Sequence, residues 1–144
     1  MADADLEQLV THKVIRRCEP DLEAARRELQ MARAHIESAA TVAVDDPNAA
    51  FQLAYDGARK AVAAHMRARG CRVGSGMGAH AKTGRYALAV FRDQAVRPHV
   101  ERFDDLRVVR NESEYDALLL DEADARDALV DADAIVTYVE RDLA

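Results

Sequence analysis

Residues 45–70 carry the strongest helix signal in the chain and read DDPNAAFQLAYDGARKAVAAHMRARG. Asp46 is a favourable N-cap, Pro47 suits the first turn of a helix, and Gly70 is a typical stop. Between them, one apolar face recurs at steps of three and four residues. That face consists of Phe51, Ala54, Tyr55, Ala58, Val62 and Met66. The stretch predicts a long helix, and Gly57 in its middle indicates a close contact with another helix, because glycine lowers helix stability.

Similar patterns predict helices in the rest of the chain. We expect a first helix over 5–17, a second that opens at Pro20, a fourth over 80–94, a fifth that starts at Pro98 and a last one from Asp121. Aromatic residues make up only 5% of the chain, and no segment alternates β-branched residues as a strand does. The sequence therefore predicts an all-α fold: one domain over 1–144, built as an up-and-down bundle of four to five main helices plus a short N-terminal helix.

The second predicted helix carries a narrow apolar seam at alternating steps of three and four residues. The seam consists of Leu22, Ala25, Leu29, Ala32, Ile36 and Ala39. Seams of this kind join helices, and together with the polar motif RNESEY at 110–115 the seam indicates a second copy of the chain facing the first. A homodimer is expected.

Composition bounds the class of protein. No stretch approaches the ~20 apolar residues of a membrane span, and the acidic start MADADLEQLV lacks the features of a signal peptide. A cytoplasmic protein without a membrane partner is expected. Cys18 and Cys71 form no C-x-x-C pair, so no structural zinc site, other metal site or cofactor is predicted.

Charge is distributed unevenly along the chain. Residues 59–110 carry 12 basic and 4 acidic side chains, net +8, whereas residues 111–144 carry 2 basic and 11 acidic side chains, net −9. The basic block suits contact with nucleic acid phosphates. Pairing with the acidic last helix explains the same pattern, and the sequence leaves both interpretations open.

Arg110 continues an apolar stripe, because Phe103, Leu106 and Arg110 are spaced three and then four residues apart. A guanidinium on such a face needs acceptors, since its burial is otherwise costly. Glu114 lies four residues further on and is one candidate partner. The other interpretation is that Arg110 lines a cleft and binds phosphate with two parallel hydrogen bonds.

The glycine-rich segment 71–79 precedes the fourth predicted helix. It falls one residue short of a P-loop and lacks the preceding strand. A looser anion site at the start of that helix and a simple connection remain as alternatives. The other histidines lack ligand spacing and are predicted to lie on helix surfaces: His12, His35, His65 and His99.

Three short motifs, in this order and spacing, resemble the HEPN superfamily. They are YDGARKAV at 55–62, the glycine-rich loop that ends in His80, and RNESEY at 110–115. The last is similar to the form in one prokaryotic branch of the superfamily, in which an arginine is followed by three residues, an acidic residue and a tyrosine. The resemblance implies a compact helical bundle over roughly residues 20–142.

The resemblance also implies a function. Active HEPN ribonucleases cut RNA without metal and pair arginine–histidine motifs across a homodimer, and prokaryotic members often accompany a nucleotidyltransferase in toxin–antitoxin pairs. On this basis the expected site binds RNA or a nucleotide around Arg110. The candidate catalytic residues are Arg110, Tyr115 and His80, and the candidate ligand-binding residues are Asn111, Glu114, Lys82 and Arg107. Because a tyrosine stands where the histidine would be, a non-catalytic interaction module, antitoxin-like or an adaptor subunit, is the alternative.

Overall fold

A computed structural model describes the backbone of residues 2–144 and the side chains of residues 4–144. Within this part of the chain there are six helices and two very short strands. They are α1 (Ala2–Thr11), β1 (Arg16–Arg17), α2 (Leu22–Val42), α3 (Pro47–Arg69), β2 (Cys71–Arg72), α4 (Ala79–Val90), α5 (Arg97–Tyr115) and α6 (Glu122–Asp142). The predicted all-α class is confirmed.

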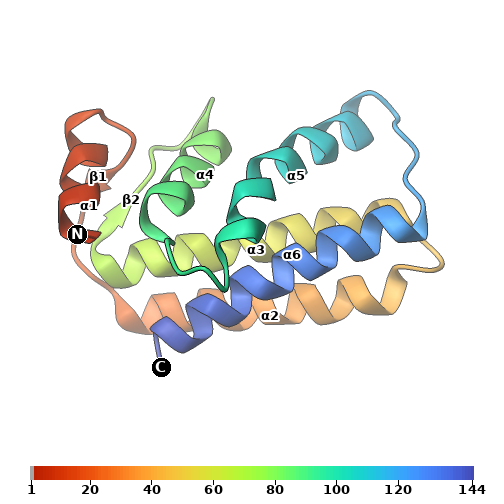
Figure 1. The fold of residues 1–144 in the computed structure, drawn as a ribbon, viewed down its shortest axis with the longest axis horizontal. Coiled ribbons are helices and arrows are strands. Elements are labelled where there is room, and N and C mark those ends of the chain that lie inside the picture. Colours follow the sequence, from red (N-terminus) through yellow and green to blue (C-terminus); the bar gives the residue numbers. More distant parts are fainter. Residues whose placement is uncertain (1) are drawn as a thin grey trace.

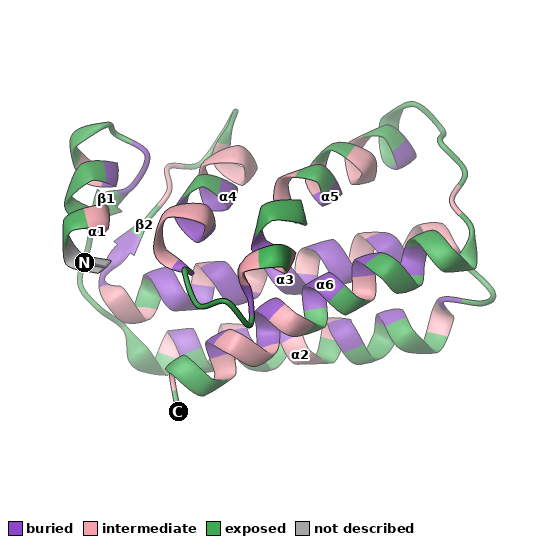
Figure 2. Ribbon diagram, in the orientation of Figure 1, coloured by how far each residue is buried: buried purple, intermediate pink, exposed green. Residues whose placement is uncertain are grey.

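Three long helices form the body of the bundle. Figure 1 shows α2, α3 and α6 side by side, with α4 and α5 along one side of this layer and α1 next to α4. In Figure 2 the buried residues are concentrated on the surfaces where these helices meet. Helix α3 contacts α2, α4, α5 and α6, so it is the central element of the fold. None of the described helices is long and apolar enough to cross a membrane.

The predicted boundaries of α3 are confirmed. The Asp46 side chain accepts a hydrogen bond from the Ala49 N–H, Pro47 occupies the first turn, and Gly70 ends the helix in the left-handed conformation. The same capping chemistry starts α6 with a complete capping box: the Asp124 N–H donates to the Asp121 side chain, and the Asp121 N–H donates to the Asp124 side chain. These ends follow from local sequence, which explains why the pattern located them.

The N-terminal region differs from the sequence prediction. A helix is predicted over 5–17, but α1 ends at Thr11, and Lys13 follows with a positive φ of 59°. This turn brings Val14 and Ile15 into the core, where they are almost fully buried. Arg16 and Arg17 then pair antiparallel with β2. Burial of two β-branched side chains prevails here over continuation of the helix.

The apolar seam of α2 packs against other helices of the same chain. Its members from Ala25 to Ala39 are buried, and α2 packs on α3 and α6. A Cβ added at Gly57 of α3 would lie 2.9 Å from Ile36 Cδ1 and 3.1 Å from the Ala32 carbonyl oxygen. The close contact expected at Gly57 is therefore confirmed. The seam itself gives no support to a homodimer, which stays a prediction.

We predict that Gly57→Ala destabilises the protein by about 1 kcal/mol, because α2 and α3 must separate and overpacking costs more than the helix propensity gained. Gly84→Ala is the matched control. Gly84 is also helical and buried, but an added Cβ there meets its nearest neighbour at an ordinary 3.5 Å. This variant should be neutral or slightly stabilised. Urea unfolding measures both, and equal stability of the two variants would contradict the close approach.

Candidate functional site

Arg110 lies on the inner side of α5 and is largely covered. Its side chain is 17% exposed, and its Nη1 atom lies 3.0 Å from Glu114 Oε2 and 3.4 Å from Asn111 Oδ1. The ion pair that the spacing indicated is confirmed. The Nε atom of Arg110 is buried and has no hydrogen-bond partner, so Glu114 satisfies only part of the guanidinium.

Helix α3 contributes Tyr55 and Arg59 to the same region. Tyr55 is fully buried, and its ring stacks on Phe103 of α5 with centroids 5.6 Å apart. Arg59 lies one turn further on, with its Nε atom 3.8 Å from Asp56 Oδ1. That distance is too long for a hydrogen bond. The Tyr55 hydroxyl and Arg59 Nε are both buried without a partner.

His80 completes the group from the first turn of α4. Its ring centroid lies 6.0 Å from that of Tyr55. Burial lowers the pKa of His80, and the positive charges of Arg59 and Arg110 lower it further. The imidazole is therefore neutral at pH 7 and able to accept a proton. We call Tyr55, Arg59, His80, Arg107 and Arg110 the arginine cluster.

The arginine cluster has an unusual balance of charge and hydrogen bonding. Each of its arginines has a carboxylate neighbour on its own helix, as in the 2.8 Å contact of Arg107 Nε with Asp104 Oδ1. Burial raises the pKa of Tyr55 to about 12 even though three arginines act against that shift. The hydroxyl is therefore protonated and able to donate.

Among the residues that the structure describes, three buried side-chain nitrogen or oxygen atoms lack a hydrogen-bond partner. They are Tyr55 Oη, Arg59 Nε and Arg110 Nε, and all three belong to the arginine cluster. Each can donate a hydrogen bond. A buried donor without an acceptor costs about 1–3 kcal/mol. The cluster therefore suits a ligand with several acceptor oxygens.

The structure brings together only some of the residues that the sequence indicated. Five of them lie near the junction of α3, α4 and α5: His80, Arg107, Arg110, Asn111 and Glu114. Two residues lie elsewhere. Tyr115 is 74% exposed at the end of α5, and Lys82 lines a separate hollow with α1 and β1.

Sequence reasoning missed Tyr55 and Arg59 as members of the site. The motif YDGARKAV supports only the family resemblance in the sequence analysis, although Tyr55 and Arg59 are spaced four residues apart and so share a face. That spacing, together with an arginine on a mostly apolar helix, was the available signal.

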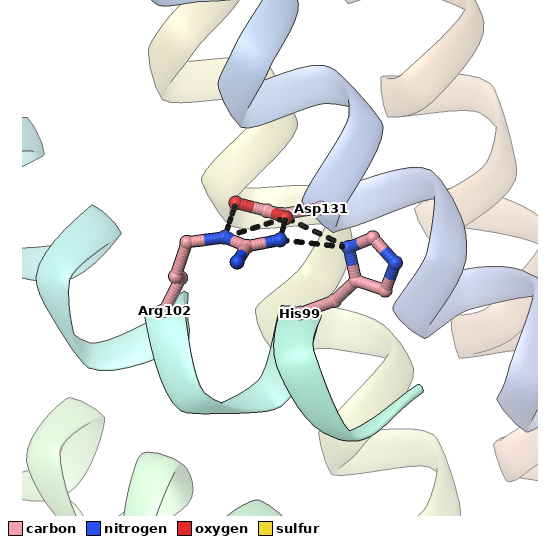
Figure 3. Close-up of polar contacts among 3 residues, drawn as sticks. All are labelled: His99, Arg102 and Asp131. Carbon is pink, nitrogen blue, oxygen red and sulfur yellow. Dashed lines mark hydrogen bonds and ion pairs between the residues drawn. The ribbon is translucent and has the colours of Figure 1, made fainter. Parts of the chain in front are cut away.

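A second polar group joins α5 to α6, and Figure 3 shows its geometry. Asp131 is buried and accepts hydrogen bonds from Arg102 Nη2 at 2.7 Å and Arg102 Nε at 3.0 Å, and its Oδ1 lies 2.7 Å from His99 Nδ1. The carboxylate is saturated by these contacts. The group therefore fixes the start of α5 on α6, and none of its buried side-chain nitrogen or oxygen atoms lacks a partner.

The prediction that His65 lies on a helix surface is wrong. His65 is 1% exposed, and its two ring nitrogens lie 2.7 Å from the Tyr86 hydroxyl and 2.7 Å from Asp142 Oδ2. Burial lowers its pKa. His99, half-buried against Asp131, also departs from the predicted exposed position. Both histidines are core or interface residues because contacts distant in sequence cover them.

Comparison with known proteins adds no assignment to this geometry. No family model, curated protein or solved structure matches the chain significantly. The resemblance to HEPN domains therefore stays an expectation that rests on the quoted motifs.

We predict that Arg59→Gln raises the pKa of His80, because the variant removes a cation that disfavours the imidazolium. The measurement is an NMR titration of the His80 ring protons, with Arg126→Gln as a control that removes one arginine charge from α6. An unchanged midpoint in Arg59→Gln would show that Arg59 does not face His80.

Proposed function

We propose that the chain binds RNA through a phosphate group held by the arginine cluster. The observation that carries the proposal is the concentration of unpartnered buried donors at Tyr55, Arg59 and Arg110. A phosphate bound where the side chains of Arg59 and Arg107 reach the surface would supply the acceptor oxygens that these donors lack. Charge-assisted hydrogen bonds from guanidinium to phosphate are among the stronger ones in proteins.

The exposed parts of the arginines support the same proposal. The side chains of Arg59 and Arg107 are each 26% exposed, so part of each remains within reach of a ligand. A guanidinium fork matches two phosphate oxygens at once, which favours phosphate over a compact monovalent anion. The first turn of α4, which carries His80, adds the positive end of a helix dipole to the site.

RNA is the preferred ligand because of the charge of the surrounding chain and the HEPN resemblance. Among the arginines of residues 59–110, Arg102 alone forms an ion pair with a carboxylate of α6 in the part of the chain that the structure describes. Neutralisation by the last helix therefore accounts for little of the basic block. Six of the other arginines pair with carboxylates of α1, α2, α3 or α5 instead. The cations that form no ion pair with a described carboxylate are available to a polyanion, and they are Lys60, Arg69, Arg72, Lys82 and Arg85.

His80 favours cleavage of RNA as a second candidate function. A neutral imidazole beside a bound phosphodiester can take the proton of the adjacent 2′-hydroxyl. The 2′ oxygen then forms a bond to phosphorus while the bond from phosphorus to the 5′ oxygen breaks, and the leaving oxygen takes a proton from water. The products are a 2′,3′-cyclic phosphate and a 5′-hydroxyl end. The arginines stabilise the extra negative charge at phosphorus, so His80 would take the role that the resemblance gave to position 115.

We predict that Arg59→Gln and Arg110→Gln each weaken binding of a fluorescein-labelled single-stranded RNA by about tenfold or more, because each removes charge-assisted hydrogen bonds. Fluorescence anisotropy at fixed salt measures the affinity. Arg27→Gln is the control, because Arg27 is an exposed arginine paired with Glu23 on α2. Wild-type protein that binds no RNA would reject the proposal and leave the non-catalytic interaction module ahead.

If the protein cleaves RNA, we predict that cleavage persists in EDTA and is lost in His80→Asn, while RNA binding is retained. The cleavage rate should fall as pH decreases through the lowered pKa of His80, because the protonated imidazole cannot accept the proton. A gel assay on a labelled oligonucleotide measures these effects. Binding without cleavage in the wild type would limit the function to recognition, and cleavage that survives in His80→Asn would remove His80 from the mechanism.

A further inference from the structure

A basic hollow lies on the other side of α4 from the arginine cluster. It has a volume of about 680 Å³ and is formed by the end of α1, the following turn, β1, the loop after β2 and Lys82. Its lining includes four cationic side chains and no carboxylate. The four cations are Lys13, Arg16, Arg17 and Lys82.

These cations are held together against electrostatic repulsion. Arg16 stands directly opposite Arg72 in the β1–β2 pair, and like charges in that position destabilise a sheet. Arg17 pairs with Glu7, but Lys13, Arg16 and Lys82 form no ion pair with any carboxylate whose side chain the structure describes. The guanidinium of Arg16 approaches Gly74, where an added Cβ would lie 4.0 Å from Nη2. This concentration of unneutralised charge suits a polyanion.

We infer that the basic hollow binds a second phosphate of the RNA strand held by the arginine cluster, an inference that rests on the proposed function. Residues two apart in a helix point in roughly opposite directions, so His80 and Lys82 flank the first turn of α4. The two sites are therefore separated by about one helix diameter, roughly 10 Å. A stacked strand rises about 3.4 Å per nucleotide and covers this width in about three or four nucleotides.

The loop between the two sites leaves a path for such a strand. Gly76 and Gly78 precede α4 with positive φ angles of 98° and 82°, and a Cβ added at either position would meet no atom within 4 Å. Gly78 caps α4 without a side-chain hydrogen bond. The Ala79 N–H donates to the Gly76 carbonyl, which leaves the N–H groups of His80 and Ala81 in the first turn for an anion. A strand crossing here would contact the arginine cluster, the start of α4 and the basic hollow in turn.

The inference is tested by the dependence of affinity on oligonucleotide length. Wild-type protein should bind an octauridylate more tightly than a diuridylate, because only the octamer reaches both sites. Arg16→Gln/Lys82→Gln should weaken octamer binding by about tenfold. It should also reduce the slope of log K against log salt concentration by about 0.7, the contribution of one phosphate contact in single strands. Binding of the dimer, followed by NMR at the His80 ring, should be unchanged.

The matched control is Arg27→Gln/Arg126→Gln, which removes the same charge from two exposed residues of α2 and α6 that each pair with a glutamate on their own helix. It should leave both affinities unchanged. Octamer affinity that is retained in Arg16→Gln/Lys82→Gln but lost in Arg110→Gln would overturn the second site and keep the proposed function. A wild type that binds neither oligonucleotide overturns both, and binding of an acidic peptide instead would assign the hollow to a protein partner.

Discussion

The structure depends on the burial of α3 between its neighbours. Small residues make this burial possible, because a helix lined with alanine and one glycine lets other helices approach closely. At Gly57 the backbone of α3 lies against Ala32 and Ile36 of α2, while α4, α5 and α6 cover its remaining sides. A helix covered on so many sides brings its few polar residues into interfaces. Buried polar side chains such as Tyr55, Arg59 and His65 therefore each need a hydrogen-bond partner. Whether the rest of the chain supplies that partner determines the role of each residue.

The buried polar groups of the bundle fall into two kinds. Asp131 is saturated by Arg102 and His99 (Figure 3), and His65 is held at both ring nitrogens. Such satisfied groups fix the relative positions of helices and need nothing more. The arginine cluster is different, because its orphaned donors keep a cost of about 1–3 kcal/mol each. Among the described side chains, the buried nitrogen and oxygen atoms without a partner are these three, so the unused hydrogen-bonding capacity is concentrated in one site.

Local chemistry made much of the fold predictable, whereas the site depended on contacts between distant residues. The ends of α3 could be predicted from sequence, because capping by Asp46, Pro47 and Gly70 depends only on residues a few positions away. The end of α1 could not, because the burial of Val14 and Ile15 depends on the rest of the core. Arg110 was found because it interrupts an apolar stripe on its own helix. His65 was not, since only the packing of other helices shows that it is covered. For Arg59 the one local signal was its four-residue spacing from Tyr55.

The internal carboxylates of the arginine cluster bear on the kind of anion that it can hold. Asp104 and Glu114 already neutralise part of the charge of Arg107 and Arg110, so a small free anion competes with groups that are permanently present. A strand that also occupies the basic hollow has an advantage, because its second contact forms at a high effective concentration once the first is made. The hollow has no carboxylate in its lining, and of its four cations only Arg17 pairs with a described carboxylate, so the hollow contributes attraction with less such competition. Partial neutralisation at one site and mostly unpaired charge at the other together favour a polyanion over a single phosphate, which is the selectivity that the proposed RNA binding requires.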